Sequence, residues 1–108
     1  MIKYLYHHFY IIVILFCLAA AQHEISIEGL HTKGNDYYNL GDYDNAIIIF
    51  ENLLAEQELG YEHDDIQIAI TLTRLGEMYS HTGMYDIAAY YFQQAINILE
   101  KSFQANKK

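Results

Sequence analysis

The stretch "NLGDYDNAIIIF" (Asn39–Phe50) returns in altered form as "HTGMYDIAAYYF" (His81–Phe92), 42 residues further along the chain. Glycine, tyrosine, aspartate, alanine and phenylalanine occupy the same places in both. A sequence that matches itself at a fixed period is typical of a protein built from stacked copies of one small unit. Shifting the whole chain by 42 residues extends the match to the pairs Leu30/Leu72, Gly34/Gly76, Tyr37/Tyr79, Gly41/Gly83, Tyr43/Tyr85, Ala46/Ala88 and Phe50/Phe92.

Each copy has the apolar spacing of two helices joined by a tight glycine turn. We expect helices over about residues 25–40 and 43–59, and then from a cap at Asp64 to about residue 81 and over 84–103. The 108-residue chain contains no proline to interrupt them. An apolar face on the second helix of each copy predicts the core residues, which are Ala46, Phe50, Leu53 and Leu54, then Ala88, Phe92, Ala95, Ile96 and Leu99.

The repeated glycines have separate mechanical roles. Gly34 and Gly76 lie inside the first helix of each copy, where the lack of a side chain lets the second helix approach closely. Gly41 and Gly83 follow that helix and can end it in a left-handed backbone conformation at no steric cost. We expect the repeated tyrosines to fill the space around the helix crossing, at Tyr37, Tyr43, Tyr79 and Tyr85.

The pattern L-x-x-x-G-x-x-Y-x-x-x-G-x-Y-x-x-A-x-x-x-F resembles the tetratricopeptide repeat. Two copies, at about residues 27–60 and 69–102, give a domain over residues 22–104 with a basic tail at 105–108. The 42-residue period and the stretch "LGYEHDD" (Leu59–Asp65) are similar to the longer kinesin light chain type of repeat. The copies differ at Lys33, where the second has the apolar Leu75. The resemblance implies an all-α, short α-solenoid of four helices.

The N-terminus has the layout of a secretory signal peptide. Residues 9–21 are 13 consecutive apolar residues that end in Ala19-Ala20-Ala21, an A-x-A pattern that suits cleavage. We expect residues 1–21 to be removed, taking Cys17 with them, and the mature chain to be secreted, periplasmic or in the lumen of the secretory pathway. The alternative is an uncleaved anchor through residues 9–21, which would place the chain on a membrane.

The charge of the chain excludes one class of partner. Fourteen acidic side chains all lie after residue 22, against five basic ones in the same region, which gives the expected mature chain a net charge of −9. Such a chain repels phosphate backbones, so we expect no nucleic-acid partner. Scattered histidines without ligand spacing, the loss of the cysteine and the absence of a nucleophile motif predict no metal, no cofactor and no catalytic residue.

The resemblance implies a protein or peptide partner in the groove formed by the first helices of the two copies. The residues that map to the lining of this groove are Glu28, His31, Asn35, Tyr38, Ile70, Thr73, Arg74, Glu77 and His81. A second surface follows from the last helix, on which Ile87, Tyr91 and Ile98 form an apolar line with no helix after it to cover them. We expect this end face to self-associate or to dock on another protein. The alternative is a structural fragment of a longer solenoid.

Overall fold

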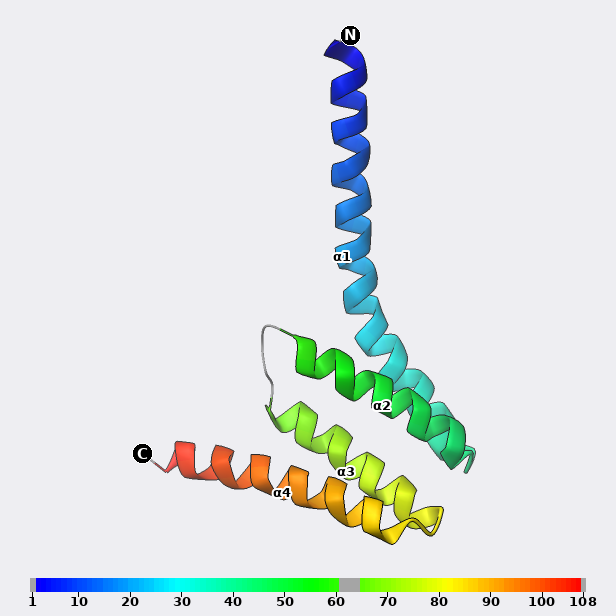
Figure 1. Ribbon diagram of the computed structural model, residues 1–108, viewed down its shortest axis with the longest axis vertical. Helices are drawn as coiled ribbons and strands as arrows, with labels where there is room; N and C mark the ends of the chain where they lie inside the picture. Colours follow the sequence, from blue (N-terminus) through cyan, green and yellow to red (C-terminus); the bar gives the residue numbers. More distant parts are fainter. Residues whose placement is uncertain (1, 61–64, 108) are drawn as a thin grey trace.

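The computed structural model describes residues 2–60 and 65–107, with the backbone alone at residues 20–26 and 65. The described residues form four helices: α1 (Ile2–Asn39), α2 (Tyr43–Leu59), α3 (Asp65–His81) and α4 (Tyr85–Asn106). The second half of α1 packs against α2, α2 against α3, and α3 against α4 (Figure 1). Two helical hairpins therefore stack in chain order, as the repeat predicts, and α3 lies between α2 and α4. The centre of the "LGYEHDD" stretch and the predicted cap at Asp64 fall on residues 61–64, outside the described residues.

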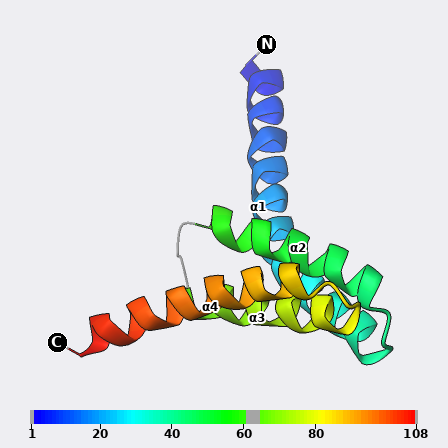
Figure 2. The same cartoon turned by 60° about the horizontal axis from the view of Figure 1, so that its bottom comes forward.

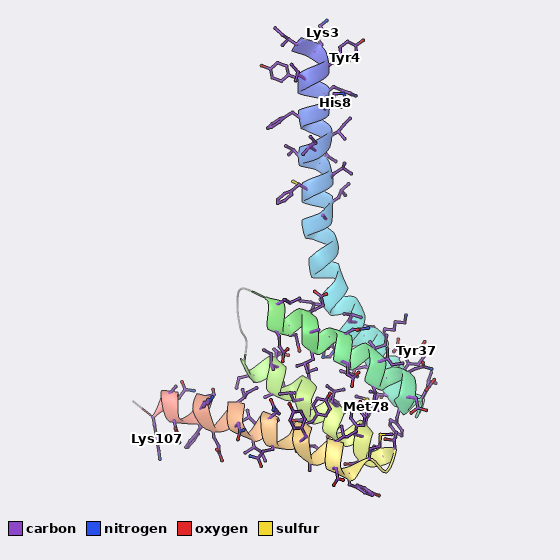
Figure 3. All side chains as sticks on the ribbon, viewed as in Figure 1. Lys3, Tyr4, His8, Tyr37, Met78 and Lys107 are labelled. Atoms are coloured by element: carbon purple, nitrogen blue, oxygen red, sulfur yellow. The ribbon has the colours of Figure 1, made fainter. Side chains whose placement is uncertain are left out.

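The first helix differs from the prediction. It begins at Ile2 rather than near residue 25 and runs to Asn39 without a break. Neither proline nor glycine occurs before Gly29, so no residue in this stretch opposes a continuous helix. The N-terminal part projects away from the hairpins, and Figure 3 shows Lys3, Tyr4 and His8 on it. Its stretch Ile2–Ala19 is apolar and none of it is buried, and its length of 18 residues suffices to cross a membrane or to act as a signal sequence.

The two glycine turns are built alike. Gly41 and Gly83 have φ of +74° and +82°, in the left-handed region. In the first turn the amide of Asp42 donates to the carbonyl of Tyr37 at 3.0 Å and that of Gly41 to Tyr38 at 3.0 Å, the two bonds of a Schellman motif. The second turn repeats both bonds 42 residues later, from Met84 to Tyr79 at 2.9 Å and from Gly83 to Ser80 at 3.1 Å. The predicted helix ends at residues 40 and 81 are thus confirmed to within a residue.

The close helix crossing predicted at the other two glycines is also confirmed. A Cβ atom added at Gly34 would lie 2.8 Å from Cε2 of Phe50, and one added at Gly76 would lie 2.6 Å from Cε1 of Phe92. Each phenylalanine ring therefore lies directly on the bare backbone of the preceding helix. One buried cluster joins α2 to α3, where Met78 is visible in Figure 3, and consists of Ala46, Ile47, Phe50, Leu53, Leu75 and Met78. A second joins α3 to α4 and consists of Ile68, Ala69, Leu72 and Ala95.

The core predicted for the last helix needs correction. Ile96 and Leu99 are 46% and 45% exposed, and Tyr85 is 70% exposed, although all three were expected in the core. In the first copy the corresponding side of α2 is covered by α3, whereas no described helix covers this side of α4. The line of α4 that faces α3 is centred instead on the small residues Ala88 and Ala95.

Candidate functional site

The exposed side of α3 gathers four of the predicted groove residues. Ala69, Ile70, Thr73, Arg74 and Glu77 line a hollow of about 160 Å³, which Leu99 of α4 closes on the far side. The rows Ala69–Thr73–Glu77 and Ile70–Arg74 each have spacings of four and lie side by side, so these residues share one face of α3. Sequence reasoning missed Leu99 because it was assigned to the core. The signal that could have found it is its place on a side of α4 that none of the four described helices covers.

Arg74 connects this face to the first repeat. Its guanidinium carbon lies 4.9 Å from the centre of the Tyr38 ring on α1, a cation–π contact, and Nη1 donates a hydrogen bond of 3.3 Å to Oε2 of Glu77. The Arg74 and Glu77 side chains remain 41% and 39% exposed, so solvent screens the ion pair and it adds little to stability. The structure thus brings Tyr38, Arg74 and Glu77 together as one polar cluster that spans both repeats.

The remaining predicted groove residues form separate local contacts. On α1 the side-chain amide nitrogen of Asn35 lies 3.0 Å from Nδ1 of His31. Glu28, one turn earlier, contributes its backbone carbonyl as acceptor for the Thr32 hydroxyl. At the far end His81 stacks on Tyr43 with ring centres 4.6 Å apart and planes 4° apart. These contacts orient the side chains, but they do not join Glu28, His31 or Asn35 to the Arg74 cluster.

A single carboxylate oxygen connects α2 with both later helices. The Tyr79 hydroxyl of α3 donates to Oε1 of Glu51 at 2.6 Å, and the Tyr91 hydroxyl of α4 donates to the same oxygen at 3.4 Å. The two tyrosine rings are stacked, with centres 5.5 Å apart. Burial, and then the hydrogen bond to Glu51, raise the pKa of Tyr79 far above its ordinary value of 10.0; burial followed by the charge of Glu51 raises the pKa of Tyr91.

These raised pKa values predict a loss of stability in alkali. The unfolded chain releases the tyrosine protons near pH 10, whereas the folded chain retains them. The contribution of these tyrosines to the free energy of unfolding is therefore at its full value below pH 10, and it decreases as the pH rises toward the folded pKa values. We expect Tyr79→Phe to lower the free energy of unfolding at pH 7 by about 1 kcal/mol through loss of the hydrogen bond. It should also flatten the decline above pH 10, as measured by urea unfolding at pH 7 and pH 10.5.

Tyr90→Phe is the matched control, because Tyr90 is 60% exposed on the same helix as Tyr91. It should leave both the stability at pH 7 and its alkaline decline close to those of the parent chain. An alkaline decline in Tyr79→Phe as steep as in the parent would show that Tyr79 is not the titrating group.

The predicted end face is not a single open surface. Ile87 is 42% exposed, as expected. Tyr91 is half-buried against Tyr79 and Glu51, and Ile98 is half-buried against the cluster formed by α3 and α4. Ile87 is therefore more exposed than Tyr91 and Ile98, which are partly covered by the neighbouring helices.

In the part of the chain that the structure describes, no three histidine, cysteine, aspartate or glutamate side chains gather where they could hold a metal ion. The groove cluster contains one cation, one carboxylate and a phenol ring, which can bind and orient a polar group.

Stacked antiparallel helical hairpins with a repeated close crossing at glycine define an α-solenoid. A family model of the tetratricopeptide repeat matches residues 26–101, and the chain therefore belongs to this family. Proteins of this family are in general modules for protein–protein interaction that act as non-catalytic scaffolds. No curated protein and no solved structure matches the chain.

Proposed function

We propose that this chain is an exported, non-catalytic adaptor that binds a segment of a partner protein along α3, with Arg74 as its polar anchor. The observation that supports this is the position of the Arg74 guanidinium. Tyr38 and Glu77 hold it in place while a large part of it stays exposed beside the hollow. A guanidinium has five N–H groups, and those not directed to Glu77 can donate to a carboxylate or carbonyl of a bound segment.

The hollow adds the apolar part of the recognition. Ile70 and Leu99 flank the Arg74 cluster, and Ile70 is 45% exposed. A segment that pairs an apolar side chain with a nearby carboxylate or carbonyl would contact both at once. His31 and Asn35 on α1 contact each other and not the Arg74 cluster, so they are a separate polar pair on the first repeat.

Photocrosslinking tests the groove. We expect a photoreactive amino acid at Thr73 in the full chain, expressed in its own cells, to form an adduct with a partner protein. The same amino acid at Ile48, which is 56% exposed on α2, should form none and is the control. Arg74→Ala should reduce the adduct at Thr73 about tenfold, because a lost charged hydrogen bond costs about 1.5 kcal/mol or more. An adduct that forms equally well with Ala at position 74 would contradict the assigned anchor.

Export is the second part of the proposal, and it rests on the exposed apolar stretch Ile2–Ala19. The alternative, a membrane-anchored adaptor, is supported by the continuity of α1, since the same helix leads from this stretch into the first repeat. The N-terminal sequence of the protein isolated from cells distinguishes the two. A start at Gln22 in the exported fraction supports cleavage, whereas Met1 retained in the membrane fraction supports the anchor.

We also propose that the repeats are of the longer kinesin light chain type. The 42-residue shift between the two Schellman turns supports this, since it is longer than the usual period of 34 residues. A fragment of a longer solenoid is the remaining alternative, and the uncovered side of α4 supports it. Detection in cells of a longer product carrying a third hairpin would establish that alternative.

A further inference from the structure

An apolar stripe runs along nearly the whole of α4 on the side that faces away from α2. Its residues, called here the α4 stripe, alternate at spacings of four and three and are Tyr85, Ala89, Phe92, Ile96, Leu99 and Phe103. Ile96, Leu99 and Phe103 are 46%, 45% and 66% exposed, and Phe92 is half-buried. Spacings of this kind place side chains in the narrow seam along which two helices pack together.

The first repeat shows how such a stripe is normally covered. Tyr43, Ile47, Phe50 and Leu54 stand 42 residues before the first four stripe residues. All four are buried or half-buried in the cluster that joins α2 to α3. Phe50 is 1% exposed there. Figure 1 shows α4 on the outside of the stack, and Figure 2 shows its last turns extending beyond the start of α3. The α4 stripe is therefore a packing surface of the same kind, and a helix is the element that fits it.

A second copy cannot cover the stripe by stacking its first repeat on it. The residues of α3 that pack against α2 include Leu75 and Met78, both fully buried. At the corresponding positions α1 carries Lys33 and Asp36, both exposed. Head-to-tail stacking would bury these two charges against an apolar stripe, and the loss of their hydration makes this strongly unfavourable. The open, fibre-like assembly that such stacking generates is therefore disfavoured.

Pairing of α4 with α4 meets no such obstacle. α2 carries four acidic side chains and no basic one, whereas Asp86 and Glu100 on α4 are balanced by Lys101 and Lys107. Two copies of this acidic chain can therefore meet at α4 without the net repulsion that α2 would cause. An antiparallel arrangement brings Lys107 of each copy close to Asp86 of the other, while a parallel one would bring like charges together.

We propose that the chain forms a closed homodimer in which the α4 stripes of two copies pack antiparallel about a two-fold axis near Ile96. In this arrangement the bulky Phe103 of one copy meets the small Ala89 of the other at both ends of the contact. The stripe of each copy also borders α3, so the α4 helix of the second copy takes the place that a following repeat would occupy. This surface deepens the proposed adaptor function. It shares Leu99 with the hollow beside α3 but contains none of Tyr38, Arg74 and Glu77.

Disulfide crosslinking of the full chain tests the dimer. Cys17 is the only cysteine, and Cys17→Ser removes it. Two differently tagged chains, one with Gln93→Cys and one with Glu100→Cys, are co-expressed and oxidised. The antiparallel arrangement brings these two positions together across the axis, within reach of a disulfide. The control pair Gln94→Cys and Lys101→Cys has the same spacing on the opposite side of α4. We expect the first pair to crosslink at least ten times more efficiently than the second.

Two isoleucines of similar exposure provide matched variants. Ile96→Asp places a charge on the axis and should abolish the crosslink between positions 93 and 100. Ile87→Asp, at a residue 42% exposed on the other side of α4, should leave it intact. Circular dichroism of both variants verifies that the helices are retained. Four results would each overturn the dimer. The first two are equal crosslinking of the control pair and a preference for joining two copies at position 93. The other two are a crosslink between positions 93 and 100 that survives Ile96→Asp and crosslinks formed only with a different protein. The Arg74-dependent adduct at Thr73 is read separately, so the two proposals can fail independently.

Discussion

Leu75→Ala is expected to lower the free energy of unfolding by about 2–5 kcal/mol. Leu75 is 0% exposed and lies in the cluster that joins α2 to α3, so its removal leaves a cavity at the contact between the two repeats. Domains of this size have only about 5–10 kcal/mol of stability in total. We therefore expect urea unfolding, followed by circular dichroism, to show a midpoint strongly reduced or a chain already partly unfolded in water.

Leu59→Ala is the control for this substitution. Leu59 is 75% exposed at the end of α2, so the same change in side chain should alter the free energy of unfolding by no more than about 0.5 kcal/mol. A similar loss in both variants would show that the cluster around Leu75 does not hold the repeats together.

Gly34→Ala should destabilise the chain by about 1–3 kcal/mol, although alanine favours helices more than glycine does. The added methyl group would lie 2.8 Å from the Phe50 ring, and this ring is enclosed by α3 and cannot move away. At Gly76 the distance to Phe92 is shorter, at 2.6 Å. Phe92 is only half-buried, however, so its ring can swing outward, and we expect Gly76→Ala to cost less than Gly34→Ala.

Gly29 supplies the internal control for both substitutions. It lies on α1 one and a half turns before Gly34, and a Cβ atom added there would meet nothing within 4 Å. Gly29→Ala should therefore stabilise the chain by about 0.5–1 kcal/mol, the ordinary gain from replacing glycine in a helix. If Gly34→Ala also stabilised, the close crossing at Phe50 would be refuted.

The local parts of the fold could be predicted from the sequence because local chemistry determines them. Gly41 and Gly83 end their helices through their own backbone conformation, and Gly34 and Gly76 mark the crossings through the missing side chain. The start of α1 could not be predicted from the signal pattern, because a sequence that suits cleavage is also a good helix former. For α4, the apolar spacing predicted an amphipathic helix but not which apolar residues would be covered. That depends on the neighbouring helix, as Phe50 and Phe92 show.

The groove was predictable in part for the same reason. Ile70, Thr73, Arg74 and Glu77 share a face of one helix, and their spacing alone places them together. The contact between Arg74 and Tyr38 joins residues of two helices that are not consecutive in the chain. The geometry of this contact depends on how the two hairpins stack, and a local sequence pattern does not predict that stacking.

The unbroken path of α1 has a consequence for a chain that keeps its N-terminal residues. A continuous helix transmits rotation as well as distance, so the face of the apolar stretch and the face of the groove have a fixed angle between them. Inserting one residue between 19 and 27 would turn the repeats by about 100° around the helix axis and move them by about 1.5 Å. Inserting seven would restore the angle to within about 20°. On a membrane, the number of residues in α1 would thus determine the direction in which the groove points.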